Sequence, residues 1–318
     1  MTDICGVRKI IYLINPISGT RGKRSLKEMI RQKTQEQGID FDILPTNAEG
    51  DYSHLPELIR NEGVTDIVIC GGDGTVSAVA AALYKPRDAS RGATGVRLGV
   101  IPMGSGNGLA FAASIPKDPA KALDIVFAGK ATPIDGILIN DHFSCMLCGV
   151  GLDGKVAYEF AGQQKRGLRT YIRITMRNFF TARPYPFRIV SLPGDKDGQR
   201  ELGVDAFFIS VANGNQFGNN FTIAPKASLH DGLLDIVVAL KTNRFRFLWS
   251  VIRQVMGGYP VAPLSLNGDG KKIIYFQTPR LEIWNVGGAP LHIDGDPAKS
   301  AAIYHINVVP DAILLIVP

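Results

Sequence analysis

The sequence predicts a mixed α/β protein in two parts: an N-terminal parallel sheet with helices, then a C-terminal antiparallel, sandwich-like β domain. Up to Gly129, short apolar runs alternate with segments of helical periodicity, and from Pro133 onward strand patterns follow one another. In the first part, two strands end in glycine-rich bends that each open a helix. We therefore expect a domain over residues 1–133 and a β-rich domain over residues 134–305, with residues 306–318 packing back on the first.

The first predicted strand, residues 9–14, runs into a polar and strongly basic loop that begins at Asn15. A helix is expected from Ser25, where Glu28 completes a capping box, to about Gly38. The loop lacks the spacing of a P-loop, so it is either a solvated basic turn or a phosphate contact. Its place between a strand and a helix favours the phosphate contact, with Lys23 as the main cation.

A second strand over residues 39–44 places Thr46 at the same edge of the sheet, either near a ligand or as a simple cap. The stretch from Asp66 to Cys70, apolar after its first residue, predicts a buried strand, and Gly71-Gly72-Asp73-Gly74-Thr75 follows it directly. Glycines allow backbone amides to approach a polyphosphate, because no Cβ intervenes. A carboxylate at Asp73 suits such a site only if it holds a metal, a sugar hydroxyl or a proton; otherwise it is a capping residue.

The strand over residues 97–101 ends in a second glycine bend, Gly104-Ser105-Gly106-Asn107. A dinucleotide fingerprint would need glycine or alanine at position 109, which is Leu109, and this is not the first strand–helix turn. The pattern therefore disfavours a nicotinamide-dependent dehydrogenase.

The second half of the chain is rich in strand patterns. A hairpin is expected from residues 134–139 and 143–150, and its second strand contains Cys145 and Cys148. Residues three apart on a strand point to opposite faces, so a metal or redox pair is disfavoured. Further strands are expected at 187–192, 204–212, 234–240, 273–277, 281–285, 291–293, 303–309 and 313–317.

Composition narrows the class of protein. Hydrophobic residues make up 45% and charged residues 20% of the 318-residue chain, as in ordinary globular proteins. A net charge of +6 favours anionic partners such as nucleotides or acidic membranes. No apolar run reaches the roughly 18 residues of a spanning helix, and no signal peptide is evident, so we expect a cytoplasmic protein. No zinc-finger or RNA-binding signature is present, which argues against nucleic acid.

Taken together, the motifs resemble those of the diacylglycerol kinase catalytic-domain family, which includes sphingosine kinases and bacterial YegS-like lipid kinases. The likeness covers nearly the whole chain. It is carried by Asn15-Pro16-x-Ser18-Gly19, Gly71-Gly72-Asp73-Gly74-Thr75, Gly104-Ser105-Gly106-Asn107, Asp231-Gly232-Leu233-Leu234-Asp235 and Asp294-Gly295-Asp296.

The resemblance implies ATP-dependent phosphorylation of a lipid hydroxyl, such as diacylglycerol or a sphingoid base, in a cleft between the two domains. It implies a general base at Asp296. Asp73, placed to bind magnesium through water or to take the acceptor proton, is the competing candidate. A structural Mg²⁺ would be held by Asp231 and by the carbonyls of Ser228 and Leu233. The implied nucleotide-binding residues, together with those proposed above, are Asn15, Lys23, Thr46, Gly71, Gly72, Asp73, Gly74, Thr75, Val76, Ser77, Gly104, Ser105, Gly106 and Asn107.

Two departures from the family pattern keep the acceptor and the activity open. Asp296 stands where the family has Glu, one methylene longer, and Gly108 stands where bacterial diacylglycerol kinases tend to carry Asp. The alternatives are an NAD kinase-like enzyme, which would share the Gly-Gly-Asp-Gly element, and a catalytically inactive lipid- or nucleotide-binding protein.

One helical segment points to the lipid. Arg169, Arg173 and Arg177 line one face at four-residue spacing, and Leu168, Tyr171, Ile172, Thr175 and Phe179 share another. Such a helix either lies on an anionic membrane or packs its apolar face into the core. The expected partners are thus a lipid substrate at an anionic membrane surface, with peripheral association, and the oligomeric state is left open, a homodimer included.

Overall fold

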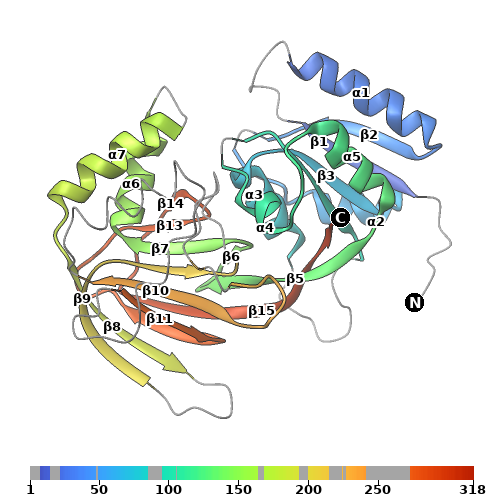
Figure 1. Ribbon diagram of the computed structural model, residues 1–318. Coiled ribbons are helices and arrows are strands. Elements are labelled where there is room, and N and C mark those ends of the chain that lie inside the picture. Colours follow the sequence, from blue (N-terminus) through green and yellow to red (C-terminus); the bar gives the residue numbers. More distant parts are fainter. Residues whose placement is uncertain are drawn as a thin grey trace. The chain divides into compact units, whose positions relative to one another are not determined.

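The structure is a computed structural model (Figure 1). It describes residues 8–14, 22–47, 49–84, 95–104, 106–163, 168–192, 200–214, 224, 227–240 and 273–318, without the side chains of 22–24, 168 and 200. The chain forms two compact units. The first comprises residues 1–134 and 311–318, and the second residues 135–310. Two strands, β5 (Ala131–Ile139) and β15 (Ile303–Ile316), run from one unit into the other.

The first unit is built on a parallel sheet in the order β2-β1-β3-β4. Its strands are β1 (Lys9–Ile14), β2 (Asp40–Pro45), β3 (Asp66–Gly71) and β4 (Arg97–Pro102), and the end of β15 pairs in parallel with β4. All residues of β3 are buried, which explains the apolar run from Ile67 to Cys70.

Among its described residues, this unit has five helices: α1 (Gly22–Glu36), α2 (Leu55–Glu62), α3 (Asp73–Leu83), α4 (Gly108–Ala112) and α5 (Pro119–Ala128). The chain moves from β1 to β2 in one direction across the sheet, and through β3 to β4 in the other. Right-handed crossovers therefore place α1 on one face and α2 and α3 on the other. Lys33 of α1 and Asp124 of α5 form an ion pair at 2.9 Å, and α2 packs beside α3.

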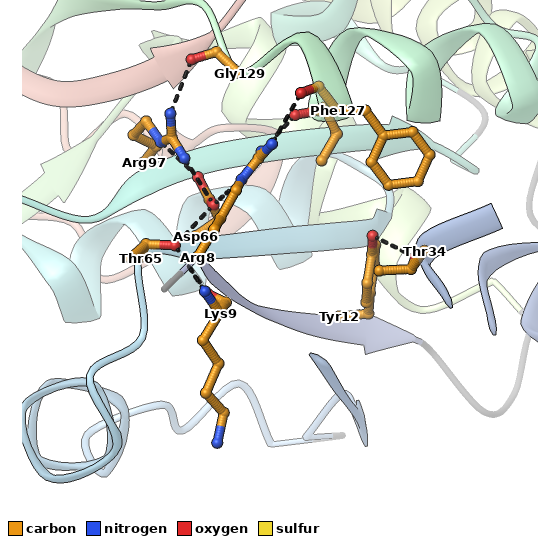
Figure 2. Close-up of polar contacts among 10 residues, drawn as sticks. Arg8, Lys9, Tyr12, Thr34, Thr65, Asp66, Arg97, Phe127 and Gly129 are labelled. Carbon is orange, nitrogen blue, oxygen red and sulfur yellow. Dashed lines mark hydrogen bonds and ion pairs between the residues drawn. The ribbon is translucent and has the colours of Figure 1, made fainter. Parts of the chain in front are cut away.

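A buried carboxylate ties the amino ends of the strands together (Figure 2). Asp66 is fully buried and accepts hydrogen bonds from Arg8 at 2.8 Å and from Arg97 at 2.6 and 2.9 Å. The same arginines donate to the carbonyls of Val126, Phe127 and Gly129 at the end of α5. This cluster lies at the sheet edge opposite the glycine bends, so we assign it to stability.

The second unit is an antiparallel β structure in which the order β14-β13-β7-β9-β8-β12-β15 can be followed. The long strand β9 (Arg200–Ala212) pairs with β8 (Tyr185–Leu192) through its first half and with β7 and β10 through its second. The other strands in the part of this unit that the structure describes are β6 (His142–Ser144), β7 (Leu147–Gly151), β10 (Leu234–Leu240), β11 (Ile273–Thr278), β12 (Arg280–Trp284), β13 (Leu291–Ile293) and β14 (Asp296–Ala298).

Two helices, α6 (Leu152–Ala161) and α7 (Leu168–Thr181), pack on each other and add a second apolar cluster to this unit. The turn from β7 into α6 requires glycine at Gly151, which has φ +113°. A methyl group at Gly154 would lie 2.2 Å from the Pro290 carbonyl oxygen, so α6 rests directly on the chain entering β13.

Three predicted elements differ from the structure. Helix α1 begins at Gly22 rather than Ser25, so the end of the basic loop is helical. The second hairpin strand is broken at Cys145 and Met146 into β6 and β7. The last two predicted strands are one continuous strand, β15.

Candidate active site

The two glycine bends of the first unit touch each other. Strands β3 and β4 are neighbours, with Gly71 opposite Pro102, and the Met103 amide donates to the Gly71 carbonyl at 2.9 Å. A methyl group at Gly104 would lie 2.5 Å from the Cα of Gly72, a distance that no real Cβ contact allows. Glycine is therefore needed here for a close approach of two backbones, at the carboxyl edge of a parallel sheet.

The side chain of Asn107 closes the second bend. Its Oδ1 accepts from the Gly104 amide and its Nδ2 donates to the Gly104 carbonyl, both at 2.8 Å. Asn107 is buried and has φ +55°, the left-handed region that Asn tolerates better than most residues. The turn before α4 is therefore locked by its own side chain.

Asp73 links the two bends. It is the first residue of α3, after the N-cap Gly72, and its Oδ1 accepts from the Leu109 amide of α4 at 3.4 Å. Thr75 and Val76 donate their amides to the Gly72 carbonyl, which begins the helix. The first turns of α3 and α4 thus start side by side, and helix N-termini favour bound anions.

The strand order adds a second reason to expect a ligand here. The sheet changes its winding direction between β1 and β3, and ligands of open α/β sheets bind at such a switch point, outside the carboxyl ends of the strands. Thr46 follows β2 at this edge, is nearly buried, and donates its amide to the Ile14 carbonyl at 3.1 Å. Strand β1 separates it from the Gly72 bend.

Not every predicted nucleotide residue can be placed. Asn15 and Ser105 lie outside the described residues, and Lys23 is described only through its backbone in α1. The structure brings together Gly71, Gly72, Asp73, Gly74, Thr75, Val76, Ser77, Gly104, Gly106 and Asn107 at the two bends.

The predicted base, Asp296, lies in the second unit on a tight hairpin between β13 and β14, where it pairs with Ile293 and is exposed. The turn residues Asp294 and Gly295 both have positive φ, at +49° and +87°. Asp294 Oδ1 accepts from the amides of Met146 and Leu147 and from the Ser144 hydroxyl, at 2.8–3.2 Å. Asp294 therefore anchors the hairpin to the break between β6 and β7.

The predicted metal loop also lies in the second unit. Asp231 is exposed, and its Oδ1 accepts from the Leu233 amide at 3.1 Å, while the Ser228 hydroxyl accepts from the His230 amide at 3.3 Å. Gly232 turns the loop with φ +68°. The predicted ligands, one carboxylate and two carbonyls, are oxygen donors of the kind that Mg²⁺ takes, with water completing its coordination. Within the described residues, no group of three or more His, Cys, Asp or Glu side chains could hold a metal.

Sequence reasoning missed a buried carboxylate behind this loop. Asp135 is 2% exposed, and its Oδ2 accepts from the Gly232 amide at 2.8 Å. Its backbone amide donates to the Leu229 carbonyl, and its carbonyl accepts from the buried Asn213 side chain. No short motif marks Asp135, because its partners are distant in sequence.

Helix α7 carries the three predicted membrane residues, all exposed. Arg177 forms an ion pair with Glu159 at 2.6 Å, whereas Arg169 and Arg173 have no ion pair among the residues the structure describes. Ile172 and Phe180 are 38% and 41% exposed. The helix itself contains no acidic residue. None of the helices that the structure describes has the length and hydropathy that crossing a bilayer requires.

A parallel sheet with two joined glycine bends, followed by an antiparallel β unit, is the mixed α/β arrangement of the diacylglycerol kinase-like fold. Residues 9–139 match the model of the diacylglycerol kinase catalytic domain. Residues 147–317 match that of the YegS C-terminal NAD kinase beta sandwich-like domain. The chain therefore belongs to the diacylglycerol kinase family of the YegS type.

Curated relatives span nearly the full chain. The protein named diacylglycerol kinase of Bacillus subtilis is 29% identical over 313 residues, covering 95% of each chain. A protein named "Probable lipid kinase YegS-like" of Chromohalobacter salexigens is 26% identical over 292 residues, covering 90% of this chain and 86% of its own.

Solved structures support the fold. A crystal structure of a diacylglycerol kinase from Bacillus anthracis aligns with a TM-score of 0.71 at 19% identity, covering 98% of this chain and 97% of its own. Yeast NADH kinase aligns with a TM-score of 0.51 at 10% identity, over 99% of this chain and 84% of its own.

Proposed function

We propose that this member of the lipid kinase family transfers the γ-phosphate of ATP to a hydroxyl of a lipid, of the diacylglycerol or sphingoid-base type. The observation that carries the nucleotide half of the proposal is the contact between Gly72 and Gly104 at the carboxyl edge of the sheet. Kinase chemistry in the family implies ATP use, and the relatives named as lipid kinases support a lipid acceptor.

Phosphoryl transfer requires positioning and charge neutralisation more than covalent chemistry. Backbone amides of the two glycine bends would bind the phosphates, apart from those of Gly104 and Thr75, which already donate to Asn107 Oδ1 and to the Gly72 carbonyl. Lys23 would add a positive charge. Asp73 lies at the joined bends, where its carboxylate is oriented by the Leu109 amide. It would hold the nucleotide's Mg²⁺ through water, or take the acceptor proton. Asp296 is the second candidate for that proton.

A structural Mg²⁺ in the second unit would be held by Asp231 and the carbonyls of Ser228 and Leu233. When bound, the ion would supply positive charge that fixes this loop, and it would not act on the reacting groups. The contact of Asp135 Oδ2 with the Gly232 amide, which holds the turn of this loop, supports the proposal.

Helix α7 would provide peripheral contact with an anionic membrane. Its exposed apolar residues Ile172 and Phe180 are eight positions apart and so lie on similar sides of the helix. Arg169 and Arg173 add charge complementary to acidic lipids, each worth about 1 kcal/mol near such a surface. The pairing of Arg177 with Glu159 makes its contribution smaller than the sequence predicts.

The test is a transfer assay with γ-labelled ATP and a panel of vesicle-borne diacylglycerol, sphingoid base, phosphatidylglycerol and isoprenoid alcohol. NAD is assayed in parallel. We expect a labelled lipid, and a fall of about 100-fold or more for Asp73→Asn and Asp296→Asn, since both would act on the reacting groups. Asp42→Asn, which changes an exposed carboxylate of β2, is the control.

Two outcomes would replace the proposal. Label in NAD and in no lipid would assign an NAD kinase-like activity. This alternative is retained because yeast NADH kinase has a similar fold. Thermal stabilisation by ATP with no turnover on any acceptor would assign an inactive nucleotide-binding protein.

A further inference from the structure

A histidine holds the turn that presents Asp296. His292 lies on β13, is 1% exposed, and stands opposite Gly149 of β7. Its Nδ1 accepts a hydrogen bond from the Gly295 amide at 3.3 Å, inside the turn between β13 and β14. An acceptor must offer a lone pair, so in the neutral ring the proton lies on Nε2. The imidazole therefore braces the turn from within its own hairpin.

The other ring nitrogen faces a carboxylate. His292 Nε2 lies 3.4 Å from Asp153 Oδ2, and the two side chains are 2% and 10% exposed. Asp153 is in the first turn of α6, where the helix dipole stabilises a negative charge. Its Oδ1 accepts from the Gly154 amide at 2.8 Å, which fixes the carboxylate. The carboxylate can thus orient the ring and select the tautomer that accepts from Gly295.

Gly149 provides the space for this pair. A methyl group at position 149 would lie 2.0 Å from Asp153 Oδ2 and 2.5 Å from His292 Nε2. The glycine is in an ordinary strand, with no positive φ, so backbone conformation does not require it. The side chains of His292 and Asp153 instead fill the place that a Cβ would occupy. The glycine of β7 therefore leaves the space that the side chains of His292 and Asp153 occupy.

We propose that His292, oriented by Asp153, is a positioning residue that fixes the Asp294–Gly295–Asp296 turn and through it the carboxylate of Asp296. Asp294 anchors one side of the turn to the break between β6 and β7, and His292 anchors the other through Gly295. The expected effect on catalysis rests on the proposed function, whereas the expected effect on the order of the turn does not depend on it. Because Asp is shorter than Glu, an Asp base tolerates less movement of its backbone.

The test compares substitutions that differ in one hydrogen bond. His292→Asn keeps an oxygen near the Nδ1 position, where it can accept from Gly295. His292→Leu removes it, and His292→Gln moves the amide to the Nε2 position. Ser300→Ala is the control, because it removes one hydrogen bond beside the hairpin, to the Ala289 carbonyl, without touching the turn.

Two readouts are measured on the full chain: kcat and KM for transfer from ATP, and amide hydrogen exchange in residues 291–298. We expect His292→Leu to lower kcat about 10- to 100-fold, with KM for ATP within about threefold, because misplacing a reacting group by 1 Å costs about that much. Exchange in the turn should accelerate. His292→Asn should restore most of both, and Ser300→Ala should resemble wild type.

Equal behaviour of the Leu and Asn variants, or unchanged exchange in His292→Leu, overturns the proposal. If His292→Leu does not fold, the comparison of Gln with Asn decides, and the Gln variant should show the faster exchange. If the wild type labels no acceptor, the proposed function fails, and hydrogen exchange alone still decides whether His292 orders the turn.

Discussion

At the scale of single residues, the contact between Gly72 and Gly104 gives the glycine bends a physical meaning beyond their motif. If these glycines served only to give the backbone conformational freedom, either could be replaced at moderate cost. Instead, Gly104 faces the backbone of Gly72, which cannot move aside as the end of a flexible side chain could. The bend geometry therefore depends on the absence of a side chain.

This geometry predicts the effect of Gly104→Ala. The added methyl group must push the two bends apart, so we expect a loss of about 10- to 100-fold in transfer rate, with weaker stabilisation by ATP. Gly203→Ala is the matched control, because a methyl group at Gly203 would meet no atom within 4 Å. Transfer by the alanine variant at the wild-type rate would contradict this account of the site.

The buried carboxylate of Asp66 leads to a stability prediction. Asp66→Asn keeps the shape but leaves two arginines without their anionic partner, so we expect a loss of about 3 kcal/mol in the free energy of unfolding. Asp42→Asn also removes an ion pair from the same sheet, the one with Lys9, but the Asp42 side chain is about half exposed. That control should change stability by less than about 1 kcal/mol. Denaturant unfolding measures both, and equal losses would refute the assignment.

Single residues also show where sequence reasoning stops. Asp73 and the glycines could be proposed because they follow a strand directly, within a few positions. The roles of Asp135, His292 and Asp153 could not, because each acts on a segment brought near only by the folded sheet. The Asp294 anchor is similar: its partners Met146 and Leu147 are nearly 150 positions away.

At the scale of elements, local patterns located most strands but not their interruptions. Residues 143–150 are mostly apolar and so predict one strand. The structure breaks this run at Met146, whose amide turns to Asp294 instead of continuing a strand. Helix α1 extends to Gly22 although glycine is a weak helix former, a case where the local capping signal at Ser25 does not set the boundary.

Helix α7 is a second case. Its sequence groups Tyr171, Ile172 and Phe179 on one face, but in the structure Ile174, Asn178 and Phe179 are buried while Ile172 is exposed. Packing against α6 determines which of the apolar side chains of α7 are buried. Periodicity predicts an amphipathic helix, and the neighbouring helix determines its rotation.

The exposed side of α7 predicts how the protein binds vesicles. Arg169→Glu with Arg173→Glu should lower the fraction bound to vesicles rich in acidic lipid by about 10-fold or more, since two charges are reversed. Binding should also fall as salt rises. Arg177→Gln serves as the matched control on the same helix, because Glu159 already offsets its charge. Equal binding by wild type and the double variant would remove α7 from the membrane contact.

At the scale of the whole molecule, the alternation of strands and helices and its end near Pro133 are long-range features of the sequence. They suffice to predict an α/β part followed by a β-rich part. The structure divides the chain at Ile134 and again at Pro310, within the continuous strands β5 and β15. Both divisions lie beside a proline, Pro133 and Pro310, yet each strand continues past it, so a local turn signal does not show whether a strand ends there.

The proposed function gives the two edges of the first unit's sheet different responses to nucleotide. Magnesium ATP should slow amide exchange in residues 71–77 and 103–109 of the first unit, because bound phosphates engage backbone amides at the starts of α3 and α4. The Asp66 cluster lies at the opposite edge of the same sheet, so residues 64–68 should change far less. At 100 times its Kd, the ligand should stabilise the protein by about 2.7 kcal/mol.

Chelation by EDTA should reverse most of the protection if Asp73 binds nucleotide through magnesium, and Asp73→Asn should resemble the chelated protein. Protection that spares both glycine bends would place the nucleotide elsewhere and remove the basis for Asp73 as a catalytic residue.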